Sequence, residues 1–353
     1  MIECPNCKNL NDEDNQFCGK CGAKLPNPKY CPRGHYHSFT DDFCTKCGEK
    51  LISKVKYDKI SKKVISLRHQ ADDFKDKKEF DKALQCYDEI LKIRPDDGLT
   101  ITSKRSIYSK LGKFKEAIEC CDEEIEIDSQ DNFAYLFKGT YLHKLGKFEE
   151  AIKCFDKSIL IDSNYHSPYI DKGVSLLELG KFNDALCCFD KAFKIKNDNP
   201  FIFSFVVSKL YDFFKFEEAL NYCNMGLSYH PNDNPLINKK ARLLCLRSND
   251  DEANDFISKN NLNGARIFYS VARKLNLMGD FYKAKQYCNK SINLNSQFYH
   301  SWITMGEIYY NLEQYDESLE YFKKGFDLCS DDKEKIIKGV NKNCQDFVKS
   351  NLF

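Results

Sequence analysis

Hydrophobic and polar positions recur along most of this chain with a fixed spacing of 34 residues. The clearest markers are five alanines, each one period after the last: Ala83, Ala117, Ala151, Ala185 and Ala219. The segments around them repeat as well, as LGKFKEAIECC, LGKFEEAIKCF, LGKFNDALCCF and FFKFEEALNYC. Self-similarity at a period of this length predicts a tandem array of small structural units rather than one globular core.

The period divides the chain into eight units. We set them at 64–97, 98–131, 132–165, 166–199, 200–233, 234–264, 265–298 and 299–332. The sixth unit departs from the pattern, because the step from Ala253 to Ala284 is 31 residues and Asp250 stands where other units have phenylalanine. We therefore expect a shortened second helix in this unit, and a kink or hinge.

The segments that flank the array have characters of their own. Residues 333–353 carry apolar residues at helical spacing, which predicts a final helix that covers the exposed face of the last repeat. Residues 49–63 contain six lysines and two acidic residues, with no glycine or proline. The part from 51 to 63 is interpreted as a basic linker or as a leading helix.

The period and its fixed residues resemble the tetratricopeptide repeat, a helix-turn-helix unit. In that family a small residue in the first helix and an alanine in the second let the two helices approach, and aromatic residues wedge between them. The small residues here are Ala71, Gly139, Gly173, Ala272 and Gly306, and the wedges are Phe80, Phe114, Phe148, Phe182, Phe216 and Phe281. The resemblance implies a mostly α fold, an α-solenoid whose first helices line a concave groove.

Two groups of cysteines precede the repeats. Cys4, Cys7, Cys18 and Cys21 form two CxxC pairs, and two such turns supply the closed tetrahedral shell that structural zinc prefers. So short a segment has too few apolar residues to form a core without metal. The first group therefore predicts a zinc site within residues 1–26.

A second group repeats the first with one thiolate replaced. Its predicted ligands are Cys31, His35, Cys44 and Cys47, within residues 27–50; His37 is an alternative to His35, which Gly34 favours by permitting a tight turn. Together the groups resemble double zinc ribbons, which implies two small β-knuckles and two structural zinc ions. Four protein ligands at each site leave no open position for catalysis.

Charge and composition narrow the function. The chain has 54 basic and 53 acidic residues, so its net charge offers no strong attraction to nucleic acid or to an anionic membrane. We find no apolar stretch long enough for a signal peptide or a membrane span. Without an export signal the paired cysteines fit metal sites better than disulfides, which predicts a cytoplasmic protein.

The groove positions of the first helices are unexpectedly apolar in the middle units. Phe133, Leu136, Ile170, Val174 and Phe201 occupy positions that the family exposes. Three of the eight arginines of the chain, Arg242, Arg266 and Arg273, fall on the same stripe in the next units. We predict a partner-binding groove with apolar anchors and a polar end; the alternative is that these residues pack against neighbouring repeats.

These patterns predict a non-catalytic scaffold that binds a protein or peptide in the groove, with the zinc ribbons as a second docking module. No phosphate-binding loop, nucleophile elbow or HExxH motif occurs, so we expect neither an enzyme nor a small-molecule substrate. The alternative is a nucleic-acid-associated factor whose ribbons and basic linker contact RNA or DNA. Residues 1–48 contain six basic and six acidic residues. A ribbon region without net charge binds phosphate poorly, which weakens the nucleic-acid alternative.

Overall fold

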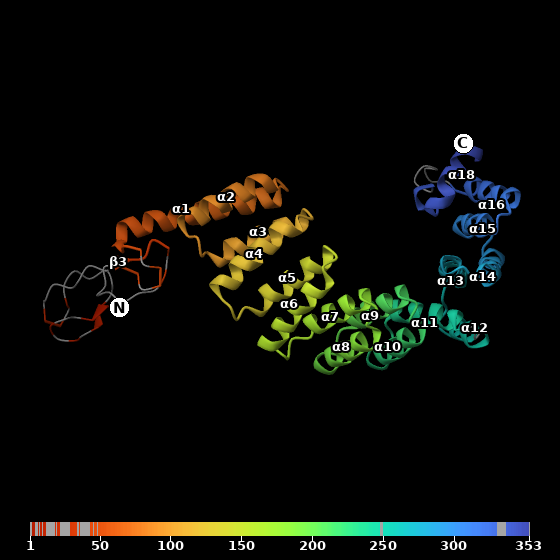
Figure 1. The fold of residues 1–353 in the computed structure, drawn as a ribbon, viewed down its shortest axis with the longest axis horizontal. Helices are drawn as coiled ribbons and strands as arrows, with labels where there is room; N and C mark the ends of the chain where they lie inside the picture. Colours follow the sequence, from red (N-terminus) through yellow and green to blue (C-terminus); the bar gives the residue numbers. More distant parts are fainter. Residues whose placement is uncertain are drawn as a thin grey trace. The chain divides into compact units, whose positions relative to one another are not determined.

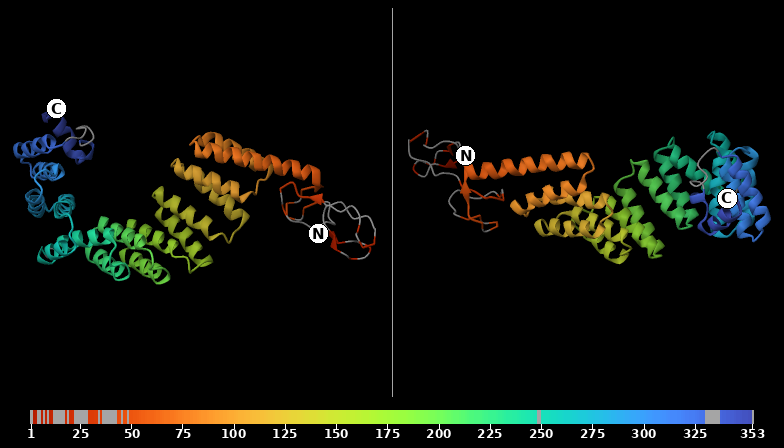
Figure 2. Two further views of the ribbon diagram at one scale, coloured as in Figure 1. Left: turned by 180° about the vertical axis from the view of Figure 1, so that it is seen from behind. Right: turned by 90° about the horizontal axis from the view of Figure 1, so that it is seen from above.

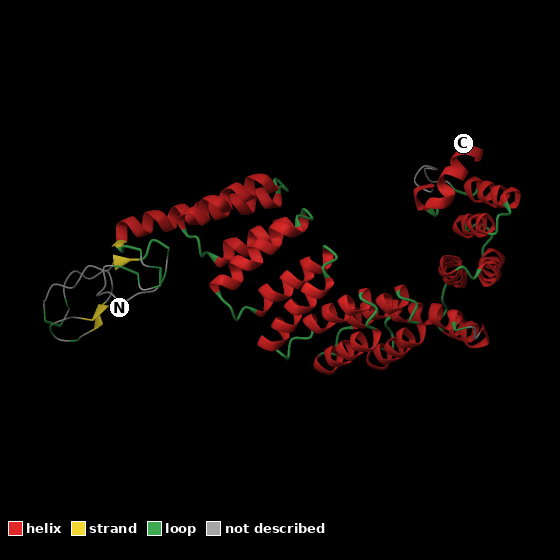
Figure 3. Cartoon of the chain, in the orientation of Figure 1, coloured by secondary structure: helices red, strands yellow, loops and turns green. Residues whose placement is uncertain are grey.

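The protein is almost entirely helical in the part that its structure, a computed structural model, describes (Figure 3). That part comprises residues 2, 3, 6, 8, 10, 11, 18, 20, 21, 29–33, 35, 43, 44, 46, 47, 49–247, 250–329 and 337–352. Contacts divide the chain into two compact units, Met1–Ala192 and Phe193–Phe353, which we describe separately. No helix of the described part combines the length and the apolar character that a membrane crossing requires.

The N-terminal region contains two short antiparallel strand pairs, coloured red in Figure 1. Strand β1 (Ile2–Glu3) pairs with β2 (Leu10–Asn11), and β3 (Lys29–Tyr30) pairs with β4 (Ile52–Ser53). β4 runs directly into helix α1 (Lys54–Asp76), so the second strand pair extends beyond residue 50 and is continuous with the helical array. The basic residues 54–63 are therefore the first turns of a helix.

Four helix pairs make up the rest of the first unit. They are α1 with α2 (Phe80–Ile93), α3 (Gly98–Lys110) with α4 (Phe114–Ile127), α5 (Asn132–Lys144) with α6 (Phe148–Ile161), and α7 (Ser167–Glu178) with α8 (Phe182–Ile195), whose last turn lies in the second unit. The second helix of one pair packs against the first helix of the next: α2 against α3, α4 against α5, and α6 against α7 (Figure 2). The predicted helix-turn-helix fold is confirmed.

The second unit continues the same arrangement. Its helices are α9 (Pro200–Asp212), α10 (Phe216–Tyr229), α11 (Asn234–Leu246), α12 (Asp250–Lys259), α13 (Gly264–Met278), α14 (Phe281–Leu294), α15 (Tyr299–Asn311), α16 (Tyr315–Asp327) and α18 (Lys342–Leu352). α12 is short, and α13 packs directly against α11. Asp250, at the start of α12, accepts hydrogen bonds from the Tyr287 hydroxyl and the Lys290 ammonium of α14. Polar contacts thus replace the aromatic wedge there.

The end of the array is covered by the C-terminal residues. Val340, Cys344 and Val348 are buried against Phe322 and Phe326 of α16. Residues 337–339 are helical, α18 follows from Lys342, and the Asn341 amide before it donates to the Glu307 carboxylate of α15. This contact adds a polar tie to the apolar cap.

Local sequence explains where the helices begin. Side chains of Asp or Asn accept backbone N–H groups at the start of α3, α5, α9, α11 and α13, which satisfies donors that a helix leaves unpaired. The turn within a helix pair needs a residue with positive φ. Gly146 (φ 75°) supplies it between α5 and α6, and Gly180 (φ 71°) supplies it between α7 and α8. The second helix then starts at a phenylalanine.

The two helices of a pair meet at a small residue. A Cβ atom added to Gly173 of α7 would lie 2.4 Å from the ring of Phe189, which is fully buried on α8. Gly139 has the same relation to Phe155, at 2.6 Å. Since such distances are far below van der Waals contact, glycine is required for the ring to fill the interface.

Replacing Gly173 by alanine should therefore destabilise the protein, by about 1–3 kcal/mol, because the added methyl group displaces the Phe189 ring or separates the helices. Gly98 offers a matched control, because a Cβ atom there meets nothing within 4 Å. Urea unfolding followed by circular dichroism should show a lower midpoint for G173A and an almost unchanged one for G98A. Equal midpoints for the two variants would contradict the packing argument.

Candidate metal centre and groove surfaces

Four side chains converge at the base of the second strand pair. The thiol sulfurs of Cys31, Cys44 and Cys47 and a ring nitrogen of His35 all lie within 4.8 Å of one another. Cys31 follows β3, Cys47 lies in a turn, and the Cys44 amide donates to the Glu49 carbonyl at 2.8 Å. Leu51 is buried against Cys31 and Cys44. The predicted second ligand group is thus assembled around one point.

The distances fit a tetrahedral zinc ion. The Cys31 and Cys47 sulfurs are 3.6 Å apart, and the His35 Nδ1 atom lies 3.7 Å from Cys31 and 3.6 Å from Cys44. Bonds of about 2.3 Å to sulfur and about 2.0 Å to nitrogen give tetrahedral edges of about 3.8 Å between sulfurs and about 3.5 Å between sulfur and nitrogen. These three distances are close to those edges, and the donor set of three thiolates and one imidazole suits Zn²⁺.

Backbone amides prepare one thiolate for a cation. Burial raises the pKa of Cys44, but hydrogen bonds, chiefly from the backbone of Cys47 and Lys46, outweigh it and lower the pKa to about 6. Two backbone donors aimed at one sulfur are a direct consequence of the CxxC turn. A thiolate rather than a thiol is the form that binds metal.

The orientation of His35 is set from outside the ribbon. With Nδ1 facing the sulfurs, Nε2 contacts the carboxylate of Asp96, in the loop between α2 and α3. A neutral imidazole that ligates through Nδ1 carries its proton on Nε2, so the ring donates and Asp96 accepts. This is the arrangement in which a carboxylate holds a metal-binding histidine.

The first ligand group is described only in part. Cys18 is buried and Cys21 is exposed, and the Lys20 amide donates to the Cys18 sulfur at 3.4 Å. Cys4 and Cys7, like the alternative ligand His37, lie outside the described residues. The first zinc site therefore remains a prediction from the sequence.

Burial corrects the apolar part of the predicted groove. Leu136, Ile170 and Val174 are 5%, 6% and 4% exposed, so these side chains pack within the repeats and offer little area to a partner. Leu136, for example, belongs to the cluster around Phe155. Phe133 in the first unit and Phe201 in the second are exposed, and Phe133 also contacts the Tyr165 ring. The alternative interpretation, in which groove positions pack against neighbouring repeats, therefore holds for Leu136, Ile170 and Val174.

Polar groups lie between α5 and α7. The His143 Nδ1 atom is 2.9 Å from the hydroxyl of the buried Ser175, and the Thr140 hydroxyl is 3.4 Å from the Asp171 carboxylate. Burial raises the pKa of Asp171 to about 6, and the Thr140 hydroxyl and the Lys144 charge offset this only in part. The pKa of Asp171 is raised because burial disfavours the charged carboxylate and, among the described residues, no ion pair compensates for it.

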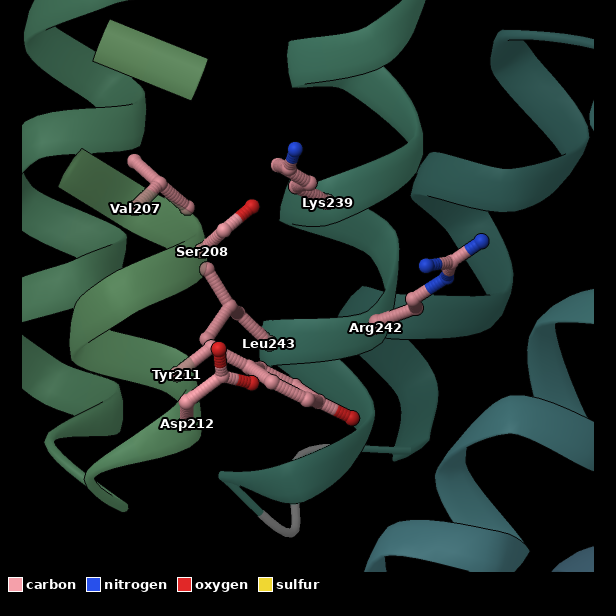
Figure 4. A pocket seen from close by; sticks show the side chains of 7 residues that line it. All are labelled: Val207, Ser208, Tyr211, Asp212, Lys239, Arg242 and Leu243. Carbon is pink, nitrogen blue, oxygen red and sulfur yellow. The ribbon is translucent and has the colours of Figure 1, made fainter. Parts of the chain in front are cut away.

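The second unit contains a cationic pocket between successive first helices. A cavity of about 330 Å³ is lined by Val207, Ser208, Tyr211 and Asp212 of α9 and by Lys239, Arg242 and Leu243 of α11 (Figure 4). The Nε atom of Arg242 is buried and has no hydrogen-bond partner among the described residues. Lys239 donates to the Ser204 hydroxyl at 2.7 Å. One acid, Asp212, stands among the lining residues.

The three predicted arginines have different surroundings. Arg242 lines the pocket of α9 and α11, whereas Arg273 lines a second cavity of about 400 Å³ with Glu307 and Lys338. Burial raises the pKa of Glu307, and the Asn341 amide and the Arg273 charge counteract it. Arg266 is exposed in the first turn of α13.

Sequence reasoning missed Asp96 and Lys239. Asp96 is 61 residues from His35, and no spacing rule links the two. Lys239 lies three residues before Arg242, so the two cations share a helix face, and this signal could have been found.

Removal of metal provides the test of the ribbons. We expect two zinc ions per chain in protein purified without chelator, measured by elemental analysis. Chelation should unfold residues 1–48, because metal binding supplies most of the folding free energy of such units, while the helical signal in circular dichroism persists. One ion or none per chain would contradict the prediction for the first ribbon or for both.

Asp171 should make stability depend on pH. Its folded pKa, about 6, exceeds the value of about 3.9 for an unfolded chain, so the folded state binds this proton more tightly. Stability contributed by this group therefore rises as pH falls through 6 toward 4. D171N should be more stable than the wild type at pH 7 and should lose this advantage by pH 4. E178Q, at an exposed position of the same helix, is the control; unfolding midpoints at both pH values measure the effect.

Comparison with known proteins agrees with this architecture. The double zinc ribbon family matches residues 4–57, and the tetratricopeptide repeat family matches residues 106–131, 134–165 and 299–332. A tetratricopeptide repeat protein from Parabacteroides merdae is similar in structure, with 15% identity and a TM-score of 0.50 over 78% of this chain and 97% of that chain. MamA is 21% identical, with a TM-score of 0.41 over 46% of this chain and 94% of its own. No curated protein sequence matches the chain. The protein is thus a tetratricopeptide-repeat protein with an N-terminal double zinc ribbon.

Proposed function

We propose that this protein is a non-catalytic scaffold that binds an acidic segment of another protein at the pocket between α9 and α11. The observation that carries the proposal is the buried Arg242 Nε atom, which lines a cavity and lacks a partner among the described residues. An unpaired buried donor is costly, and a bound carboxylate would satisfy it.

The charge of the pocket favours an anion. Burial and the nearby Arg242 charge lower the pKa of Lys239, so two cations that line one pocket disfavour each other's charged form. Lys274 of α13 lies outside the lining but adds positive charge beside it, with Nζ 4.0 Å from the centre of the Phe214 ring and 4.8 Å from that of Tyr211. An acidic group placed among these cations relieves their repulsion and gains charge-assisted hydrogen bonds.

The shape and lining of the pocket favour a peptide side chain and its apolar neighbour. Val207, Tyr211 and Leu243 supply apolar walls beside the cations. A volume near 330 Å³ is at the small end of ligand sites, and two successive first helices form its walls, as expected for a groove that holds an extended chain.

The pocket offers no arrangement for catalysis. Its lining contains neither histidine nor cysteine, and the Ser208 hydroxyl donates to the Ser204 carbonyl at 3.0 Å, so no base activates it. This supports a binding role for the repeats. Within the proposal the zinc ribbons act as a second docking module.

A nucleic-acid-associated role is the second candidate, supported by a specific surface. Lys56, Lys59, Lys62 and Lys63 are exposed on the first turns of α1, beside the second ribbon. RNA binding that weakens steeply with salt, and weakens further when these lysines are changed to glutamate, would favour it.

Selection from a library of random 12-residue peptides on the full chain should enrich sequences that combine acidic and apolar residues. The enriched peptide should bind R242E at least about 2 kcal/mol more weakly than the wild type in calorimetry, because a carboxylate replaces the guanidinium. R247E is the matched control: Arg247 ends the same helix, outside the pocket, in an exposed pair with Glu217. Unchanged affinity of R242E would exclude this pocket as the docking site.

A further inference from the structure

We propose that Asp96 is a positioning residue for the zinc ligand His35, and that zinc binding by the second ribbon is thereby coupled to the folding of the first helical repeat. The proposal is independent of the pocket between α9 and α11. It rests on contacts that cross from residues 29–53 to α1 and to the loop between α2 and α3, all within the first unit.

The coupling begins at the imidazole. Nδ1 of His35 faces the sulfurs of Cys31 and Cys44, and Nε2 contacts Asp96. A carboxylate that accepts the far N–H of a ligating imidazole fixes the ring orientation and makes the ligand more basic. Asp96 comes from the repeat array, so the array supplies part of what makes the zinc site tight.

Neighbouring residues hold the Asp96 loop in place. The guanidinium of Arg68, on α1, donates to both oxygens of Asp97, at 3.0 and 2.8 Å. Asp97 also caps α3 through the Thr100 amide, at 3.0 Å. Arg94 at the start of the loop donates to the Ser61 hydroxyl of α1 at 2.9 Å. The position of the Asp96 carboxylate therefore depends on α1, α2 and α3 being packed together.

A second set of contacts joins the ribbon to α1. The rings of Tyr30 and Tyr57 stack with centroids 4.9 Å apart, and Tyr30 pairs with Ile52 in the strand that leads into the helix. Beside Asp96, Arg33 and Lys46 of the ribbon share a cavity of about 400 Å³ with Glu123 and Glu126 of α4. Opposite charges thus face each other across the junction.

The acid at residue 96 has no explanation within the repeat itself. The same turn position holds Gln130, Asn164, Asp198 and Asn232 in the next four units, so the turn forms with amides as well as with acids. Asp198 at this position is exposed and lies 4.0 Å from Lys196. The carboxylate of Asp96 is instead explained by the imidazole that it holds.

Thermodynamic linkage gives the consequence. If an ordered first repeat tightens zinc binding by some factor, zinc stabilises the ordered first repeat by the same factor. Loss of an outer hydrogen-bond partner of this kind weakens metal binding about 10- to 100-fold. The ribbon then acts as a metal-dependent N-terminal cap of the solenoid.

The test measures zinc affinity in the full-length chain with Cys18→Ser and Cys21→Ser in every sample, so that the second site alone is titrated, by competition with a coloured chelator. D96A, which removes the acceptor of the His35 Nε2–H group, should bind zinc about 10- to 100-fold more weakly, and D198A, at the same turn position, should bind as the parent does. Circular dichroism checks that both variants retain the helical fold. Equal zinc affinities of D96A and the parent would overturn the proposal.

Two further measurements separate positioning from general damage. H35C keeps four ligands but has no N–H to donate to Asp96, so D96A should have little effect on zinc affinity in that background. Hydrogen exchange of residues 54–93 should quicken when zinc is removed from the parent chain, while residues 299–327 should not change. An equal D96A effect with and without H35C, or zinc-independent exchange of residues 54–93, would overturn the coupling.

Discussion

The close approach of two helices within each repeat is the constraint on which the rest of this structure depends. A repeat of two helices cannot bury its apolar face alone, so each interface must be filled without gaps. Gly139 and Gly173 achieve this by letting the rings of Phe155 and Phe189 lie against the backbone. The volume at one position is therefore set by the volume at the other.

The second repeat, residues 98–131, shows that this constraint acts on the sum of the two side-chain volumes. Arg105 stands where Gly139 stands one period later, and Cys121 stands in place of Phe155. A large residue on the first helix is matched by a small one on the second. Arg105 is buried, pairs with Glu124 at 2.9 Å and lies over the Phe137 ring. Its charge is tolerated because the pair and the ring replace water.

The N-terminal region is held together by different physics. Its described strands are two residues long, and Leu51 packs against the predicted ligand cysteines. We therefore expect metal ligation to replace the hydrophobic effect there. The contact between His35 and Asp96 links the metal-binding region to the helical array, because the Asp96 carboxylate belongs to a repeat and orients a predicted metal ligand. Downstream, the pocket of α9 and α11 lies on a face that the packing leaves open.

The sequence by itself determined the repeat period, the helix pairs, the turns and the second ligand group, because each depends on residues close together in the chain. It also indicated the short sixth unit, from the missing phenylalanine at Asp250. Only the tertiary structure decided that Leu136, Ile170 and Val174 are buried, because the exposure of a helix face depends on which neighbour covers it. It alone brought Asp96 to His35, since a contact across 61 residues is set by how the ribbon and the first repeats pack, and no local pattern records that.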